Sequence, residues 1–254
     1  MILQKTQSKE CLTLSLLWLR FFIDIFFYLE RANLVKLCIE NINNTGAVLM
    51  TVACDNPHVN FKMLTSLGAS LTANNIDPEL NIKNALGLPV YALLDPAHLI
   101  KVSRNTLGDC KVLKDGDGNF IRWRFIEKLH EIQESEGLHL GNKIKKQHIE
   151  FYKNKMSVHL AASVFRRKVA IGLSVCEHDL KLTDLKGSGA TGEFLAGIGD
   201  VFDTMNSKYT FKKGPKAPMS IENEEEWSER FSKFTRYIHG LRHDSAQLLI
   251  EGVQ

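Results

Sequence analysis

Cysteine is scarce and irregularly spaced in this chain. The 254 residues include five cysteines, and no two of them form a C-x2-C pair, which argues against a zinc finger or a disulfide framework. With only 17 glycines and 6 prolines, the composition also excludes collagen-like and low-complexity chains. Scattered single cysteines are typical of a reducing compartment, so we expect a nuclear or cytosolic protein that is not secreted.

A strong net charge is missing as well. Lys and Arg number 32 against 29 Asp and Glu, a net +3, so the total alone indicates no polyanionic partner. The charge is nevertheless segregated. Residues 143–168 hold eight basic residues and one acid, a net +7, and residues 222–229 hold five glutamates and no Lys or Arg. The basic segment is either a solvated helix face or a surface that contacts the phosphates of DNA or a nucleotide.

A membrane-spanning segment is not expected. Residues 12–29 are membrane-like, but Arg20 and Asp24 interrupt them, each at a cost of about 2.5–3.5 kcal/mol at a bilayer centre. Their i, i+4 spacing allows an ion pair on one face of an otherwise apolar helix. We therefore expect a buried or partner-seeking helix; the alternative is sequence from outside the ancestral coding region.

Helical and strand patterns alternate in the first half. Helical spacing over residues 34–42 is followed by an apolar run over 47–54, a helical segment over 59–67 and a second apolar run over 88–94. Such continuous runs are typical of strands covered on both faces. We expect half of an α/β sheet.

The second half is predicted to be mainly helical. The turn-rich segment 115–119 is a predicted boundary, beyond which strand signals largely disappear. Amphipathic helices are predicted over residues 123–136, 148–174, 189–205 and 224–241. The predicted fold class is α+β: a partial α/β sheet followed by a mainly helical region.

Two aspartates follow the predicted strands directly. Asp55 and Asp95 stand at the carboxyl ends of the apolar runs, at the edge of an α/β sheet where ligands collect. They could hold Mg²⁺ for phosphodiester chemistry, or each could simply cap the next helix. His58 and His98 follow them by three residues, which is not a zinc-binding pattern. Because no P-loop sequence occurs, any nucleotide site is of another kind.

Five sequence blocks, in order, carry a family resemblance. They are V-A-C-D-N-P-H-V-N (52–60), L-L-D-P-A-H-L-I-K-V-S-R-N (93–105), I-R-W-R-F-I-E-K-L-H (121–130), K-M-S-V-H-L-A-A (155–162) and F-D-T-M-N-S (202–207). Together they resemble the P-element transposase family, which includes the THAP-domain transposases of animals. The resemblance extends from about Ala32 to the end of the sequence.

This resemblance implies an RNase H-like domain interrupted by a helical GTP-binding insertion. It divides the chain into an unmatched apolar segment (1–31), a partial RNase H-like domain (32–115), the insertion (116–241) and a truncated start of the resumed RNase H-like region (242–254). Asp55 matches the family's second acidic metal ligand and is the implied catalytic residue, with Asp95 and His98 in supporting roles. The other two of the three metal carboxylates find no match, so cleavage of DNA by this chain alone is not expected.

The resemblance also implies contacts to GTP and Mg²⁺. Asp203 and Asn206 match family residues at the guanine and Mg²⁺ end of the site, and an aspartate that accepts from the guanine N1 and N2 donors selects guanine over adenine. Lys143 and Val158 fall where the family's base-packing and polar contacts lie.

The implied function is that of a P-element-like DNA transposase fragment in the nucleus, with GTP as an assembly cofactor and transposon-end DNA as partner. Arg166 and Lys168 replace what are more often serines in the family, which either strengthens phosphate contact or crowds the nucleotide. One alternative is a domesticated module that binds GTP or DNA, self-associates or pairs with a full-length transposase, without catalysis. Another is a nuclease completed by a second chain.

Overall fold

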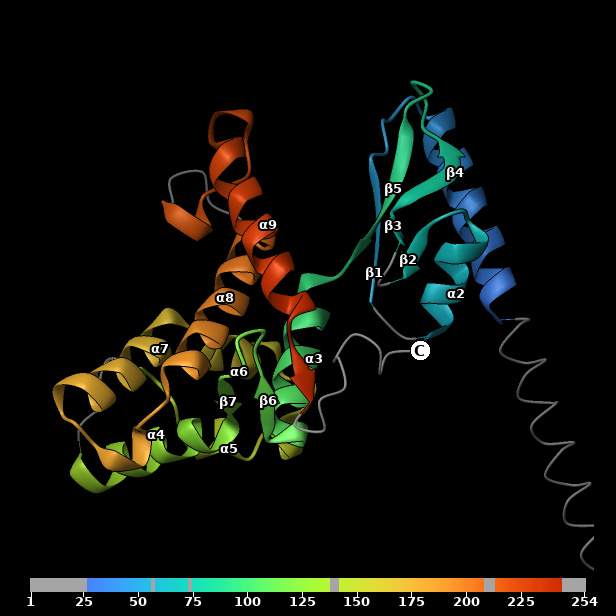
Figure 1. Cartoon of the computed structure of the whole chain (residues 1–254). Coiled ribbons are helices and arrows are strands. Elements are labelled where there is room, and N and C mark those ends of the chain that lie inside the picture. The colour runs from blue at the N-terminus through green and yellow to red at the C-terminus, as the bar shows by residue number, and fades with distance from the viewer. Residues whose placement is uncertain (1–26, 56–57, 73–74, 138–141, 208–212, 244–254) are drawn as a thin grey trace, which may run out of the picture. The chain divides into compact units, whose positions relative to one another are not determined.

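The structure is a computed structural model that describes residues 27–55, 58–72, 75–137, 142–207 and 213–243. The chain divides into two compact units between Asp95 and Pro96 (Figure 1). Both units contain helices and short strands, so the predicted α+β class is confirmed. The ion pair predicted between Arg20 and Asp24 lies outside the described residues, as does most of the segment 242–254.

The first unit is built around a three-stranded sheet. Its order is β1 (Thr51–Cys54), β5 (Pro89–Leu94), β4 (Glu79–Lys83). β1 and β5 are parallel, with Thr51 opposite Tyr91, while β4 runs antiparallel to β5. Both predicted strands of the first half are therefore present and adjacent, although β1 covers only the second half of the predicted run over 47–54.

Two helices pack on one face of this sheet (Figure 1). They are the helix over residues 27–44 and α2 (His58–Ser66). The buried core contains Ala32, Met63, Leu64, Leu67, Ala69, Leu80, Val90 and Ala92. On the other face Tyr91 and Leu93 are 37% and 41% exposed. The predicted coverage of both faces is thus wrong among the described residues, because burial alternates along the strands.

Three strands of the first unit were not predicted. β2 (Ser70–Thr72) and β3 (Asn75–Asp77) form an antiparallel hairpin, and β4 joins the main sheet. Each is only three to five residues long. Segments this short and polar contain too few alternating positions to give a periodic signal.

The second unit is mainly helical. Its α-helices are α3 (Pro96–Cys110), α4 (Trp123–Glu136), α5 (Lys146–Ile149), α6 (Val158–Val164), α7 (Arg167–Ser174), α8 (Gly189–Met205) and α9 (Glu224–His239). Short helical turns lie at Phe151–Asn154 (η1), Val175–Asp179 (η2), Thr183–Leu185 (η3), Gly214–Lys216 (η4) and Ile221–Asn223 (η5). The predicted helices over 123–136 and 189–205 are confirmed, and the one over 224–241 ends at His239. The continuous helix predicted over 148–174 is wrong, because this segment is divided among several short helices.

A small sheet of order β7-β6-β8 also belongs to the second unit. β6 (Val112–Lys114) and β7 (Phe120–Arg122) form a hairpin, and β8 (Arg242–His243) pairs with β6. The backbone N–H groups of Asp117 and Asn119 donate to Asp115 Oδ1, which holds the hairpin turn. The predicted domain boundary after residue 115 lies inside this turn. The positions of the family's domain boundaries in this chain stay predictions.

Within the described residues no helix is long and apolar enough to cross a membrane. The cysteines that the structure describes are all free: Cys38, Cys54, Cys110 and Cys176. This agrees with the expectation that they form no disulfide framework.

Candidate functional site

The first predicted site lies at the carboxyl edge of the β1-β5-β4 sheet. Asp55 follows β1 and Asp95 follows β5, and the register of these parallel strands places Cys54 opposite Leu94. The Asp95 backbone N–H donates to Cys54 O at 2.8 Å, so the pairing continues to the strand ends. The structure thus brings the two aspartate positions to neighbouring points of one edge.

A buried amide fixes the Asp55 carboxylate. Asn60, on α2, donates from Nδ2 to Asp55 Oδ1 at 2.6 Å, and Arg31 Nη1 donates to Asn60 Oδ1 at 2.9 Å. Asn60 is buried, whereas Asp55 is exposed. The arrangement holds one carboxylate oxygen in place at the sheet edge.

These residues fit part of a magnesium site. Mg²⁺ in nucleotidyl chemistry is usually held by one or two carboxylates together with substrate phosphates and water. Asp55 and Asp95 could supply such carboxylates, but the described part of the chain contains no group of three or more His, Cys, Asp or Glu residues that could hold a metal. His98 lies on α3, in the other unit. The metal role of Asp55 and the supporting roles of Asp95 and His98 stay predictions.

A second site lies in the helical unit and is rich in cations. It is a small hollow of about 30 Å³, lined by Asn142, Lys143, Ser163, Arg166, Lys168 and Val169; we call it the basic hollow. Three of these residues were singled out from the sequence: Lys143, Arg166 and Lys168. The other three are buried and form its floor.

Lys143 is presented to solvent by the buried residues on either side of it. Asn142 is 4% exposed and Ile144 is 1% exposed. The backbone N–H of Ile144 donates to Asn142 Oδ1 at 3.2 Å, so the Asn142 side chain closes a local turn. With both neighbours anchored, the side chain of Lys143 remains outside the core.

The position of Arg166 depends on a break between two helices. α6 ends at Val164 with Phe165 as its C-cap, Arg166 is extended (φ −72°, ψ 139°), and α7 begins at Arg167. Phe165 is fully buried, and a Cβ on Gly199 of α8 would lie 1.9 Å from the Phe165 carbonyl oxygen. The break between α6 and α7 thus lies where α8 approaches the backbone, and it is one of several interruptions between residues 148 and 174.

The cations of the hollow differ from four of the five other basic residues of the segment 143–168, since only Lys145 among these five also has no acidic partner within the described residues. Elsewhere in it the ion pairs are Lys146–Glu150 at 3.9 Å, Lys153–Glu150 at 2.9 Å, Lys155–Asp109 at 3.1 Å and Arg167–Asp200 at 2.5 Å. Among the described residues, no acidic group pairs with Lys143, Arg166 or Lys168. Positive charge at the N-terminus of a helix such as α7 is unfavourable and favours a bound anion there.

The floor adds a hydrogen-bond donor. Asn142 Nδ2 is buried and has no hydrogen-bond partner within the described part of the chain, whereas Ser163 Oγ donates to His159 O at 2.8 Å. A buried donor without an acceptor costs about 1–3 kcal/mol. A Cβ built on Gly172 of α7 would lie 3.0 Å from Asn142 Nδ2, next to the buried Leu129, so the donor is enclosed by protein atoms.

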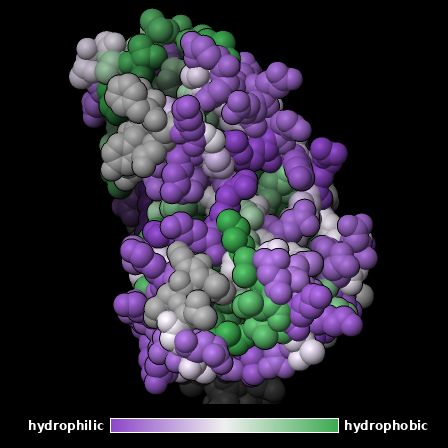
Figure 2. All heavy atoms as spheres, turned by 90° about the vertical axis from the view of Figure 1, so that its left-hand side faces the viewer, coloured by the Kyte–Doolittle hydropathy of each residue, from purple (hydrophilic) through white to green (hydrophobic). Residues whose placement is uncertain are grey.

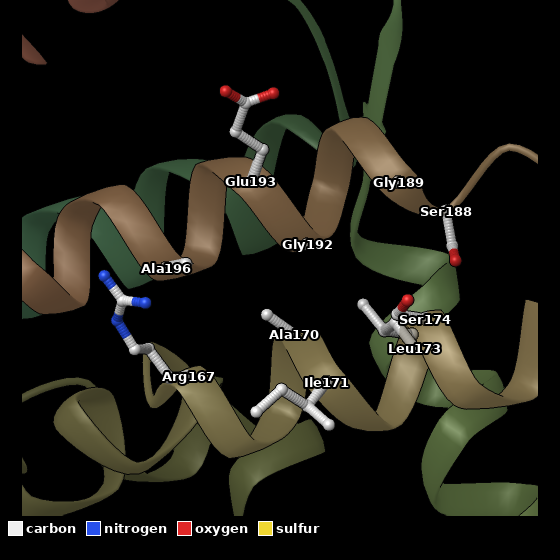
Figure 3. Close-up of a pocket in the computed structure, with 10 residues that line it drawn as sticks. All are labelled: Arg167, Ala170, Ile171, Leu173, Ser174, Ser188, Gly189, Gly192, Glu193 and Ala196. Atoms are coloured by element: carbon white, nitrogen blue, oxygen red, sulfur yellow. The ribbon is translucent and has the colours of Figure 1, made fainter. Parts of the chain in front are cut away.

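A larger groove lies between α7 and α8 (Figure 3). Its volume is about 320 Å³. Small residues, Ala170, Gly192 and Ala196, line the gap between the helices, Arg167 reaches toward α8 at one end, and Glu193 points away from α7. Figure 2 shows hydrophobic residues among hydrophilic ones on the face that carries α7. The groove is thus mainly apolar.

Glu177 binds the two residues that directly precede α8. Glu177 accepts from the backbone N–H of Gly187 at 2.6 Å and from Ser188 Oγ at 2.9 Å. Burial raises the pKa of Glu177, but these hydrogen bonds outweigh it, so its pKa lies below the ordinary carboxyl value. The glycine-rich segment before α8 therefore directs its donors at Glu177.

The remaining predicted GTP contacts lie outside the basic hollow. Asp203 is in the last turn of α8 and pairs with Lys216 at 3.6 Å, and Asn206 follows the end of that helix. Val158 begins α6 and packs partly against the core. Their roles stay predictions. One contact connects this end of α8 with the hollow. Asp200, one turn before Asp203, accepts from Arg167, which directly follows Arg166 of the hollow.

Sequence reasoning did not single out Asn142, Ser163 or Val169. Nothing in the sequence marks a buried floor, because burial of these residues depends on packing between α6, α7 and the segment before α5. The one local signal is that Asn142 directly precedes Lys143.

Three comparisons with known proteins bear on these sites. The family described as "TNP-like, GTP-binding insertion domain" matches residues 97–218. The human protein named DNA transposase THAP9 is 22% identical over 203 residues, which are 78% of this chain and 22% of that protein. The chain thus spans about a fifth of the length of this relative.

The solved "Drosophila P element transposase strand transfer complex" contains a similar chain. The similarity has a TM-score of 0.69 at 21% sequence identity and covers 84% of this chain and 47% of that one. At this identity it establishes the fold. The matched insertion domain and the similarity to the human transposase bear out the resemblance to the P-element transposase family that the sequence shows.

Proposed function

We propose that the second unit binds a guanine nucleotide and that the cations at the rim of the basic hollow contact its phosphates. The observation that carries this proposal is the gathering of three exposed cations, none with an acidic partner among the described residues, around one hollow. The hollow lies inside the region that matches a GTP-binding insertion domain. Phosphate oxygens are suitable acceptors for lysine, arginine and amide donors.

The guanine base requires a second contact. Asp203 is the predicted acceptor for the guanine N1 and N2 donors, with Asn206 beside it. Asp203 now pairs with Lys216 across 3.6 Å, and both side chains are more than a third exposed. Exposed pairs of this kind contribute about 0–1 kcal/mol, so exchanging Lys216 for a base costs little. Val158 completes the proposed contacts of the base, while Lys143 contacts the phosphates in this proposal.

Nucleotide binding is best tested by calorimetry on the full chain with GTP and with ATP. We expect GTP to bind more tightly, and Asp203→Ala to abolish this preference. Asp184→Ala is the matched control, because Asp184 is also an exposed acid paired with a lysine, Lys128, at 3.1 Å. Equal affinity for both nucleotides, or an unchanged preference in Asp203→Ala, would remove the guanine assignment.

In the cell we propose a nuclear role in DNA transposition, with GTP as an assembly cofactor and transposon-end DNA, a full-length transposase or a second copy as partner. Asp55 would bind Mg²⁺. Since only Asp55 matches a metal carboxylate of the family, we expect no DNA cleavage by this chain alone. Detectable Mg²⁺-dependent nicking by the purified chain, lost in Asp55→Asn, would contradict that expectation.

The second candidate is a domesticated module that binds DNA through the same cations without catalysis. The +7 charge of residues 143–168 favours it. Each phosphate contact should contribute a slope of about −0.9 in a plot of log affinity against log salt. A flat salt response would exclude DNA phosphates as ligands of this segment.

A further inference from the structure

We infer that the basic hollow neutralises the phosphates of its nucleotide with side-chain cations and binds them without a divalent cation. This inference rests on the proposed function and concerns the form of nucleotide that the same site takes. Nucleotide sites commonly place Mg²⁺ between protein oxygen ligands and the phosphates. The charges around the phosphates therefore decide whether a metal is required.

The lining of the hollow supplies cations and no carboxylate. Lys143, Arg166 and Lys168 are exposed at its rim, while Asn142 and Ser163 give it polar groups that carry no charge. A metal-free triphosphate carries more negative charge than its Mg²⁺ complex, so three cations attract it more strongly. A divalent cation approaching the same rim is repelled by all three side chains.

The acidic residues of α8 at this end of the unit are already bound to cations. Asp200 accepts from Arg167 Nε at 2.7 Å and from Nη2 at 2.5 Å, and Asp200 is largely covered. Asp203 pairs with Lys216 at 3.6 Å. Mg²⁺ that used Asp200 would first have to displace the Arg167 guanidinium, whereas the exposed Asp203–Lys216 pair is only a weak obstacle. The unpaired charges of this region are thus positive, which is the opposite of what a metal ion requires.

The orientation of α7 adds to this preference. Arg166 and Lys168 lie at the start of this eight-residue helix, where the helix dipole favours anions and disfavours cations. Asp200 offsets this for Arg167, but no described acid does so for Arg166 or Lys168. Bound phosphate would relieve this repulsion.

The test is calorimetry of GTP binding to the full chain in excess Mg²⁺ and in EDTA. We expect the affinity in EDTA to be equal to or tighter than that in Mg²⁺. A loss of tenfold or more in EDTA overturns the inference and leaves the proposed function standing, because GTP would still bind with its metal. Absence of binding in both conditions removes the proposed function and the inference together.

A double variant, Arg166→Ser with Lys168→Ser, tests the assignment to these cations. We expect its GTP affinity in EDTA to fall by about tenfold or more, as for lost charge-assisted hydrogen bonds, and to fall less in Mg²⁺. The matched control is Lys146→Ser with Lys153→Ser, which removes two cations of the same segment that pair with Glu150. Equal losses in the two double variants, or an unchanged affinity of the first in EDTA, overturn the inference. Circular dichroism of each variant verifies that it is folded.

Discussion

The two candidate sites of this chain differ in what holds their charges. In the second unit, cations stand over a floor of buried residues, where Asn142, Ser163 and Val169 are anchored by helices that pack into one core. In the first unit, Asp55 is exposed at the edge of a small sheet, and one buried amide, Asn60, orients it. The hollow combines cations that have no acidic partner among the described residues with a buried floor, whereas the sheet edge has two aspartate positions, one of them oriented by a hydrogen bond. The two sites both contain charged residues, and they differ mainly in how many packed residues hold those charges in place.

The largest effect is expected where packing creates the hollow. In Gly199→Ala the new Cβ would lie 1.9 Å from the Phe165 carbonyl oxygen, so the α6–α7 break and α8 must separate. We expect the second unit to lose about 1–3 kcal/mol of unfolding free energy and to lose nucleotide affinity, as measured by urea denaturation and calorimetry. Gly189→Ala, whose Cβ meets no atom within 4 Å, should leave both unchanged. If Gly199→Ala has the same unfolding free energy as the unaltered chain, the hollow does not depend on this packing contact.

Removing a single cation should weaken the ligand and spare the fold. For Lys143→Ala we expect a loss of about 1.5–3 kcal/mol in the free energy of GTP binding, with an unchanged melting temperature of the free protein, since Lys143 is exposed and has no ion pair among the described residues. Lys153→Ala is the control, because Lys153 pairs with Glu150 outside the hollow. If both variants bind GTP equally well, the hollow is not the phosphate site.

The first unit should respond to the loss of its one orienting amide. Asn60→Ala leaves Asp55 without its hydrogen bond and Arg31 without its acceptor, at an expected cost of about 1–2 kcal/mol. Hydrogen exchange should become faster in β1 and α2 while α7 and α8 keep their protection. Asn75→Ala, which removes an exposed amide from β3, serves as the control. Faster exchange in both units would show that they do not unfold independently.

The smallest expected effect is a dependence of the second unit on pH. Burial lowers the pKa of His148 below its ordinary value, so the folded protein prefers the neutral ring. The unfolded chain takes up the proton first as pH falls through about 6.5. The contribution of His148 is therefore present above that pH and is lost below it, with a slope of at most about 1.4 kcal/mol per pH unit.

Melting temperatures between pH 7.5 and 5.5 would measure this dependence. The decline toward acid should be shallower in His148→Gln than in the unaltered chain. His239→Gln, which changes an exposed histidine at the end of α9, should leave the decline as it is. The same decline in all three proteins would assign it to another group.

Apolar runs and helical periodicity in the sequence correctly predicted several strands and helices. The apolar runs that end at Asp55 and Asp95 are adjacent parallel strands, and the periodic segments over 123–136 and 189–205 are helices at those bounds. The same reasoning failed at Arg166, because the helical pattern continues across a break at which a distant helix, α8, closely approaches the backbone through Gly199. It also missed β6 and β8, which pair across more than a hundred residues of sequence.

The sequence by itself determined that positive charge is concentrated between residues 143 and 168, and it determined the pairs that need only local spacing. Lys146 and Lys153 both reach Glu150 within one helical turn. Tertiary structure decided the rest. It brings Asp109 to Lys155 and Asp200 to Arg167, and it places Lys143, Arg166 and Lys168 around one hollow without such a partner among the described residues. The reason is physical: a charge along the chain is known from its residue, but whether it is compensated depends on which distant residue the fold brings beside it.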